Sequence, residues 1–281
     1  MDVSVRPRPP AARSSPVLRV VATARLLLHE EVESGRVARL SDALRRDGVL
    51  RNPPVVALMP DDRAAVLDGA NRVTALVALG IRHAVVHVVD YARPEIVLST
   101  WRHYVRDRGG LRRRAAEVGE VRALRVDEIA SGKADLASGA AAALVMDTGG
   151  AALLGDRGGV AAVPLLSRLV ALYRGRDEIY RVEGGDLEAL HAEYGPGTLV
   201  VFPPFSKDEL VRLAAGAGRV PTGITRHLIP GRALRLNTPL DWLGAPADEA
   251  RKQEELDATV QRRWLAHGVR YYGEPTFLFD E

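Results

Sequence analysis

The chain has 281 residues, and its 39 basic and 36 acidic side chains leave a formal net charge of only +3. This near balance does not by itself indicate a nucleic-acid-binding protein, and no apolar run approaches the length of a membrane span. The sequence has no cysteine, which excludes disulfides, thiolate metal ligands and a cysteine nucleophile, and which agrees with a cytoplasmic location.

The first hundred residues are predicted to form a compact α/β unit. Residues 1–16 are rich in Arg, Pro, Ala and Ser without a hydrophobic signal core, so we expect a disordered tail and no secretion signal. Apolar runs and alternation predict strands, while apolar spacings of three and four predict helices. The predicted strands are residues 17–28, 55–58, 64–67 and 84–89, and the predicted helices are residues 37–48, 73–80 and 94–105.

The remainder of the chain reads as an α+β mixture. Gly109 and Gly110 mark a boundary, and the basic run at residues 112–114 is interpreted as a solvated helix face. Ser206 and Glu209 have the spacing of a capping box at the start of a helix. Further strands are predicted at residues 140–146, 151–154, 198–202 and 276–279, and further helices at residues 164–173, 186–194 and 247–267.

The junction at Asp68 and Gly69 is the first candidate site. An apolar run ends there and a helical pattern begins at once, so several free backbone N–H groups point at one spot. Together with the helix dipole and Arg72, these donors make a small anion site. The alternative is an ordinary strand–turn–helix junction that Asp68 caps.

Other candidate residues lie at Glu30, at Trp101 and in the run Thr225-Arg226-His227. Glu30 comes where a strand is predicted to end, so it could accept a proton from a substrate hydroxyl or help to hold a metal ion. Its alternative is an acidic first turn of the next helix. The run from Thr225 gathers a hydroxyl, a guanidinium and an imidazole in a predicted loop, which suits a small anionic metabolite; the alternative is a solvent-facing strand edge. Trp101, on a predicted helix, is by default a core or half-buried aromatic.

Taken in order, these pieces resemble the free L-serine kinases built on the ParB/sulfiredoxin fold. The siderophore-biosynthesis branch, which uses ATP, is the more similar, and the archaeal ADP-dependent branch is more distant. The resemblance covers nearly the whole chain from about residue 17. Its motifs are His29-Glu30, Asp68-Gly69-x-x-Arg72, Ser99-Thr100-Trp101, Val220-Pro221-x-Gly223-x-Thr225-Arg226 and Gly231-Arg232-x-Leu234.

The resemblance implies an enzyme that phosphorylates free L-serine to O-phospho-L-serine with ATP or ADP and Mg²⁺, in the cytoplasm, for a specialised amino-acid or siderophore-type pathway. It implies a ParB/sulfiredoxin-like nucleotide-binding domain at residues 17–108 and an α+β domain at residues 109–281 that completes the serine site. Glu30, Asp68 and Arg72 would be catalytic, with Glu30 activating the serine hydroxyl. The implied nucleotide-binding residues are Asp68, Gly69, Ala70, Asn71 and Arg72, and the implied substrate-binding residues are Trp101, Thr225, Arg226 and His227.

One departure from the family concerns the loop between Gly69 and Arg72. The family usually has one or two histidines there, whereas this chain has Ala70 and Asn71. Asn71 can donate a hydrogen bond to a phosphate oxygen but cannot carry a positive charge, so the sequence leaves the choice between ATP and ADP open. The sequence names no metal-binding residue.

The alternative function is a ParB-like nucleotide- or DNA-binding regulator without kinase turnover. It is less favoured, because the chain has no evident helix-turn-helix and no strong basic stripe. Sulfiredoxin chemistry is excluded because it requires a cysteine. The expected partners are therefore L-serine and a nucleotide, with no membrane, and the oligomeric state is left open.

Overall fold

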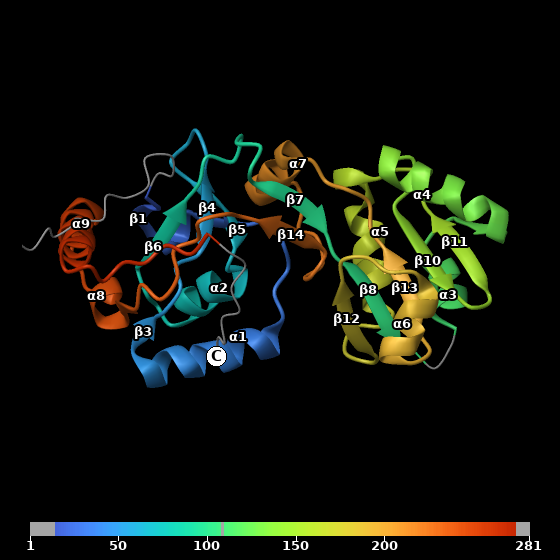
Figure 1. Cartoon of the computed structure of the whole chain (residues 1–281), viewed down its shortest axis with the longest axis horizontal. Helices are drawn as coiled ribbons and strands as arrows, with labels where there is room; N and C mark the ends of the chain where they lie inside the picture. Colours follow the sequence, from blue (N-terminus) through green and yellow to red (C-terminus); the bar gives the residue numbers. More distant parts are fainter. Residues whose placement is uncertain (1–14, 108–109, 274–281) are drawn as a thin grey trace, which may run out of the picture.

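Two β-sheets lie at opposite ends of the long axis of the molecule (Figure 1). The computed structural model describes residues 15–107 and 110–273. The mixed α/β class predicted from the sequence is confirmed. No helix within the described residues is both long enough and apolar enough to cross a membrane.

The first sheet has five strands in the order β1-β6-β4-β5-β2. Its strands β2 and β5 run parallel, as do β4 and β6, while β1 and β6 are antiparallel. Its strands are β1 (Val17–Ala22), β2 (Leu26–Leu28), β4 (Val55–Leu58), β5 (Ala64–Asp68) and β6 (His83–Val88). The helices packed near this sheet are α1 (Ser34–Asp47), α2 (Ala70–Ala78), α8 (Leu240–Gly244) and α9 (Glu249–Leu265).

The second sheet has six strands in the order β12-β8-β13-β10-β11-β9. All five of its strand pairs are antiparallel. Its strands are β8 (Arg102–Arg106), β9 (Val121–Leu124), β10 (Ala143–Asp147), β11 (Gly150–Leu154), β12 (Glu178–Val182) and β13 (Thr198–Val201). The helices of this half are α3 (Leu111–Arg114), α4 (Ile129–Ser138), α5 (Gly159–Ala171) and α6 (Leu187–Tyr194). Helix α7 (Lys207–Arg212) lies between the sheets (Figure 1), and its Leu210 packs against Ala57 and Leu67 of the first sheet.

Between the sheets, β7 (Val97–Thr100) pairs with β14 (Thr225–Leu228) (Figure 1). A second short pair, β3 (Val49–Leu50) with β15 (Thr238–Pro239), belongs to the end of the molecule that holds the first sheet, where Leu50 is part of the core. The helix predicted at residues 94–105 is therefore wrong: this stretch forms β7 and β8. The reason is tertiary, because Tyr104 in β8 pairs with Tyr180 on one side and Leu199 on the other, far away in sequence. Pairing and burial of this kind override a local helical pattern.

Several local predictions are confirmed. The first predicted strand is present, with a 3₁₀ turn, Thr23–Arg25, between β1 and β2. Gly48 ends α1 in a left-handed conformation, with φ of 69°. The capping box of Ser206 and Glu209 starts α7. The strand predicted at residues 276–279 and most of the predicted tail lie outside the described residues. The remaining short turns are Ala115–Glu117, Val126–Glu128 and the π-helical turn Leu213–Ala217.

The C-terminal helices return to the first sheet. Leu240, Leu243 and Leu256 are buried in the same apolar cluster as the strands of that sheet. Gln253 in α9 accepts a hydrogen bond from the backbone N–H of Val20 (2.8 Å). The buried ammonium of Lys252 donates to the backbone carbonyls of residues 243 and 245, each at 2.8 Å. The predicted boundary between two domains at residue 108 stays a prediction.

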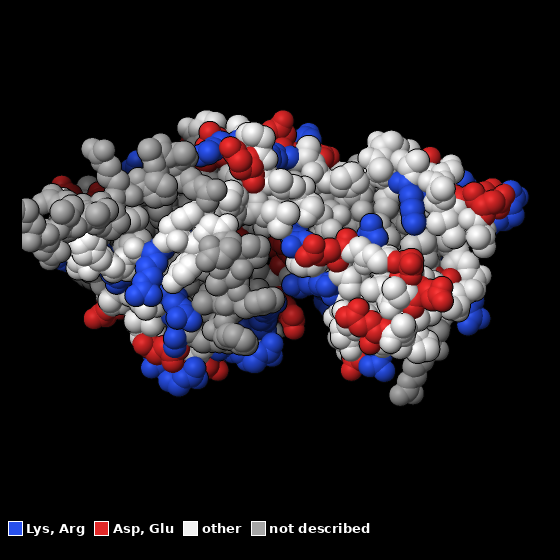
Figure 2. Space-filling model, viewed as in Figure 1, with Lys and Arg blue, Asp and Glu red and all other residues white. Residues whose placement is uncertain are grey.

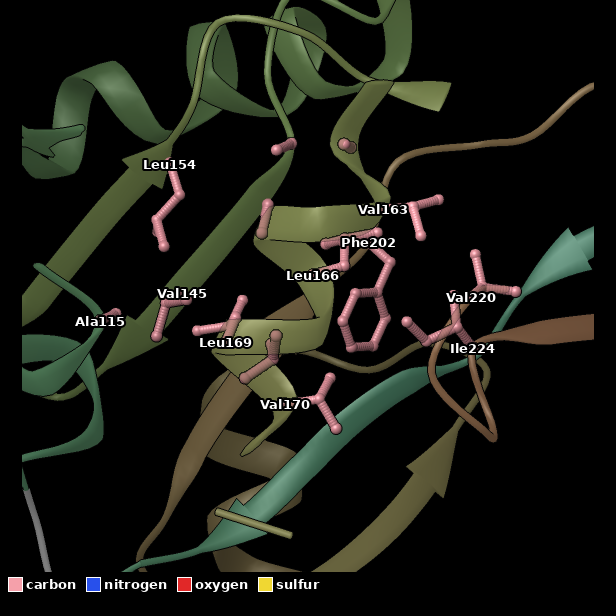
Figure 3. Close-up of a cluster of buried hydrophobic side chains, with 14 of the residues drawn as sticks. Ala115, Val145, Leu154, Val163, Leu166, Leu169, Val170, Phe202, Val220 and Ile224 are labelled. Carbon is pink, nitrogen blue, oxygen red and sulfur yellow. The ribbon is translucent and has the colours of Figure 1, made fainter. Parts of the chain in front are cut away.

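The second sheet buries its main apolar core against α5. Leu166, Leu169 and Val170 project from α5 into this core, where Phe202 lies beside them (Figure 3). Val220 belongs to the same cluster, although it follows α7 on the way back to the first sheet. The core of the second sheet therefore fixes a segment that reaches toward the other end of the molecule.

Candidate active site

Glu30 lies directly after β2, where its backbone is joined to a distant segment of the chain. The N–H of Val220 donates to the carbonyl of His29 (3.0 Å), and the N–H of Glu31 donates to the carbonyl of Val220 (2.8 Å). These bonds make an isolated parallel bridge between Glu30 and Val220. The prediction that Glu30 follows a strand is confirmed.

Two groups from the segment after Val220 hold the carboxylate of Glu30. The N–H of Gly223 donates to Oε1, and the hydroxyl of Thr225 lies 2.8 Å from Oε2. Only 16% of the Glu30 side chain is exposed. Burial raises the pKa of Glu30, and the contacts with Gly223 and Thr225 and the charge of Arg181 only partly oppose that rise. The carboxylate is therefore a stronger base than an exposed glutamate.

The segment that holds Glu30 is anchored at both of its ends. Val220 and Ile224 are fully buried, and both side chains lie near Phe202 in the core of the second sheet (Figure 3). Gly223, between them, has φ of +82°, and a Cβ there would overlap the guanidinium of Arg181. The left-handed conformation therefore favours glycine at this position, and a Cβ would also displace the Arg181 guanidinium.

Arg181 is a residue that the sequence analysis missed. It comes from β12, an edge strand of the second sheet, and its positive charge acts on Glu30. Within the part of the chain that the structure describes, no hydrogen bond or ion pair to its guanidinium is formed. A short stretch rich in β-branched and aromatic residues at positions 178–182 could have predicted the strand, but the closeness of Arg181 to Gly223 has no local signal.

Glu31 has a different environment from its neighbour. Its Oε2 forms an ion pair with Arg174 Nη1 at 2.9 Å, and 39% of its side chain is exposed. Arg174 Nη2 also donates to the carbonyl of Thr222 (3.4 Å). The two adjacent glutamates are thus distinguished by geometry: Glu30 is buried without a paired cation, and Glu31 is paired at the surface.

Two histidines lie between this region and β5, of which His29 is buried and His227 is half-buried. His29 Nδ1 lies 2.8 Å from the carbonyl oxygen of Val66, and the Tyr91 hydroxyl lies 2.8 Å from His227 Nε2. The two imidazole rings meet edge to face with their centroids 5.7 Å apart. Burial lowers the pKa of His29 to about 4 and that of His227 to about 3, so both are neutral at pH 7.

The predicted anion loop begins where β5 ends. Gly69, with φ of 98°, is the N-cap of α2, and no side chain caps that helix. The interpretation of Asp68 as a helix cap is therefore wrong, because Asp68 binds Arg72 and Arg232 instead. The N–H groups of the first turn of α2 thus have no intrahelical acceptor. The side-chain oxygen of Asn71 is buried there without a hydrogen-bond partner.

Arg72 is turned back toward the protein. Its Nη1 donates to the carbonyl of Asn52 (2.7 Å), and its Nη2 donates to Asp68 Oδ2 (2.6 Å). Burial acts to raise the pKa of Asp68, but the charges of Arg72 and Arg232 outweigh it and lower that pKa. Asp68 is therefore ionised, and the two arginines balance its charge.

The predicted run Thr225-Arg226-His227 lies on strand β14 and not in a loop. Because side chains alternate along a strand, the run divides between two faces. Thr225 and His227 face His29, whereas the Arg226 guanidinium lies 4.3 Å from the centre of the Trp101 ring. Arg226 also pairs with Glu183 at 2.6 Å. Trp101 lies between two strands and is half-buried.

The two ends of the molecule enclose a hollow on the side where α1 lies (Figure 2). Lys and Arg atoms and Asp and Glu atoms both gather around its opening. The groups that act on Glu30 come from both ends, since β2 belongs to the first sheet and β12 to the second. The fold thus brings the mostly buried carboxylate of Glu30 close to the guanidinium of Arg181, at the point where the two sheets meet.

The site offers one carboxylate of the kind that Mg²⁺ requires. Mg²⁺ takes oxygen ligands and is usually held by one or two carboxylates together with substrate phosphates. Among the described residues, no group of three or more His, Asp or Glu side chains is arranged to hold a metal ion. Asp68, beside the open N-terminus of α2, offers one carboxylate. These residues fit a Mg²⁺ that arrives with a nucleotide.

No protein-family model matches the chain. It is 26% identical to the ATP-dependent L-serine kinase SbnI of Staphylococcus aureus over 277 residues, which cover 94% of this chain and 97% of that protein. It is 28% identical to an ATP-dependent L-serine kinase of Staphylothermus marinus over 250 residues, which cover 83% of this chain and 93% of that protein. These relatives confirm the resemblance to the free L-serine kinase family.

Solved structures give the same fold. A C-terminally truncated SbnI of Staphylococcus aureus is similar with a TM-score of 0.70 and 23% identity, covering 87% of this chain and 97% of that chain. A free serine kinase in complex with AMP is similar with a TM-score of 0.69 and 17% identity, covering 84% of this chain and 98% of that chain. The fold is therefore shared over more than four fifths of this chain and over nearly all of each solved chain.

Proposed function

We propose that this protein is a free L-serine kinase, which transfers the terminal phosphoryl group of ATP, or of ADP, to the serine hydroxyl and releases O-phospho-L-serine. The observation that carries this proposal is the environment of Glu30. A buried carboxylate with a raised pKa lies at the opening between two sheets, held by Gly223 and Thr225. Full-length similarity to ATP-dependent L-serine kinases supports the choice of substrate and donor.

Glu30 is proposed to act as the general base. Phosphoryl transfer needs positioning and charge neutralisation more than covalent help, and a nearby base removes the proton of the attacking hydroxyl. The N–H of Gly223 fixes Oε1 of Glu30 and so sets the direction of the carboxylate. Glu31 is not proposed as the base, because its carboxylate is engaged in the ion pair with Arg174.

The phosphate groups are proposed to bind at the N-terminus of α2, in the loop of Asp68, Gly69, Ala70, Asn71 and Arg72. The uncapped N–H groups of the first turn and the helix dipole favour an anion there. Arg72 would act mainly by fixing Asp68, since its guanidinium is bonded to the protein. When bound, Mg²⁺ would neutralise phosphate charge, with Asp68 as its carboxylate from the protein.

The serine itself is proposed to lie between Glu30 and Arg181. Arg181 is charged and has no ion pair among the described residues, so it is suited to the serine carboxylate or to the transferred phosphoryl group. Thr225 and His227 would line the serine site on the Glu30 side of β14. Trp101 and Arg226, stacked on each other, lie on the other face of that strand and would act at the margin of the site. We also propose the ParB/sulfiredoxin-like assignment for residues 17–108. The pathway that uses the product and the cytoplasmic location stay predictions.

The test is direct. The protein is incubated with L-serine, Mg²⁺ and either ATP or ADP, and O-phosphoserine is measured by mass spectrometry. We expect product with ATP, a loss of about a hundredfold or more in Glu30→Gln, which removes the base, and most activity retained in Glu31→Gln. Absence of product with both nucleotides from a folded sample, or a fully active Glu30→Gln, would refute the proposal.

A further inference from the structure

His29 and Thr225 form a hydrogen-bond chain with Glu30 that the role of Glu30 as general base does not by itself require. Thr225 Oγ1 lies 2.8 Å from Glu30 Oε2 on one side and 2.9 Å from His29 Nε2 on the other. His29 Nδ1 in turn lies 2.8 Å from the carbonyl oxygen of Val66. His29 is 2% exposed and Thr225 8%, so bulk water does not compete for these contacts.

The partners determine where the hydrogens of this chain lie. A carbonyl oxygen only accepts hydrogen bonds, so His29 Nδ1 must carry a hydrogen. A neutral imidazole has one N–H, and therefore Nε2 of His29 presents a lone pair to Thr225. Thr225 has one hydroxyl hydrogen, which can go to Glu30 or to His29 but not to both.

The charge of Glu30 decides between these two acceptors. An ionised carboxylate is the stronger acceptor, so the hydroxyl donates to Glu30 and leaves the lone pair of His29 Nε2 facing the Thr225 oxygen. A protonated carboxyl group is a weaker acceptor, so the hydroxyl then donates to His29. His29 thus offers a hydrogen bond that is made only after Glu30 has taken up a proton.

We propose that the Thr225 hydroxyl switches between Glu30 and His29, and that His29 thereby strengthens Glu30 as a base. The inference rests on the proposed kinase function. In that reaction the serine O–H bond breaks and its proton passes to Glu30, while the serine oxygen forms a bond to the terminal phosphorus. The bond from phosphorus to the bridging oxygen breaks, and its electron pair leaves with the nucleotide. The Thr225 hydroxyl turns to His29 as Glu30 becomes neutral.

His29 is a positioning residue in this scheme, and the charged and titratable groups around it are few. Arg181 acts on Glu30 from β12. His227 faces His29 edge-on from β14 and is itself bonded to Tyr91. Among the described residues, none of these groups bonds to His29 Nε2 or to Thr225 Oγ1. The switch of the Thr225 hydroxyl is therefore confined to Glu30, Thr225 and His29.

Two substitutions of His29 separate its two ring nitrogens. His29→Asn keeps a donor near the position of Nδ1, toward Val66, and removes the acceptor toward Thr225. His29→Gln keeps an acceptor near the position of Nε2 and removes the donor toward Val66. Tyr91→Phe is the matched control, because it breaks the hydrogen bond of the neighbouring histidine, His227, without touching the chain.

The primary measurement is the titration of the Glu30 carboxyl carbon by ¹³C NMR in the full-length protein. We expect the Glu30 pKa to fall by about half to one pH unit in His29→Asn, the size of one neutral hydrogen bond, and to change much less in His29→Gln and Tyr91→Phe. The acidic limb of the pH profile of kcat/KM should shift by the same amount in the same variant.

The wild-type protein gives a second measurement that needs no variant. The ¹⁵N resonance of His29 Nε2 should change at the pH at which Glu30 titrates, because Nε2 gains a hydrogen bond there. The proposed switch would be refuted by an unchanged Glu30 pKa in His29→Asn, or by an Nε2 resonance that does not change when Glu30 titrates. Neither NMR measurement requires turnover. Failure of the kinase proposal would therefore be detected separately, as the absence of O-phosphoserine.

Discussion

Gly223→Ala is the substitution that tests most directly how the site is built. Gly223 has φ of +82°, and a Cβ there would overlap the Arg181 guanidinium. Its N–H also donates to the Glu30 carboxylate. The change therefore strains the backbone, displaces the unpaired cation and moves the donor that orients the base.

The expected magnitudes can be separated. Placing alanine in a left-handed conformation costs about 1–2 kcal/mol of stability. A hydrogen bond to a charged group is worth about 1.5–3 kcal/mol, which corresponds to a loss of roughly 10- to 150-fold in kcat/KM if the Glu30 contact is lost in the transition state. Gly80→Ala is the matched control, since Gly80 has φ of +69° and nothing lies within 4 Å of an added Cβ.

The two variants would be compared by urea unfolding and by the rate of O-phosphoserine formation. Both should lose about 1–2 kcal/mol of stability from the backbone conformation. Only Gly223→Ala should lose activity. The reasoning would be refuted if Gly223→Ala kept kcat/KM within about threefold of wild type, or if Gly80→Ala lost as much activity.

Two further predictions concern stability. Burial lowers the pKa of both His29 and His103 to about 4 in the folded protein. The stability that the folded state gains from keeping both histidines neutral is therefore complete above about pH 6.5 and is lost as the pH falls toward 4. At pH 5 each histidine lowers the free energy of unfolding by about 2 kcal/mol, and the raised pKa of Glu30 offsets part of this loss. The urea midpoint should therefore be lower at pH 5 than at pH 7.5. An unchanged midpoint would contradict this prediction. Lys252→Met should lower the free energy of unfolding by about 1–3 kcal/mol, because two backbone carbonyls lose their donor. Lys133→Met, at an exposed position, should lower it by less than about 0.5 kcal/mol. Equal unfolding midpoints for the two variants would contradict the stabilising role of the Lys252 hydrogen bonds.

Local patterns were enough to predict the elements whose signals lie within a few residues. The end of β5 at Asp68, the glycine that opens α2, and the capping box at Ser206 all follow from neighbouring residues. Glu30 could be placed at a strand end for the same reason. The helix predicted at residues 94–105 failed because strand pairing with partners about a hundred residues away decides that stretch.

The environment of the site could not be predicted from local patterns. Arg181 lies 42 residues before Gly223 in the numbering, and only the folded chain brings its guanidinium over that glycine. The alternation that separates Arg226 from Thr225 follows from β14 being a strand, which requires β7 as its partner. The two acceptors of the Thr225 hydroxyl come from residues nearly two hundred positions earlier.

The base is therefore supported from both ends of the molecule. His29 and Glu30 follow an edge strand of the first sheet, whereas Gly223 belongs to a segment whose flanking residues are buried in the core of the second sheet. Because core packing is close and rigid, the position of the Gly223 N–H is set by the second sheet and the position of the carboxylate by the first. The relative placement of the two sheets thus determines whether Glu30 is oriented and buried. A substitution deep in the second core that shifts this segment should act on the Glu30 pKa as well as on stability.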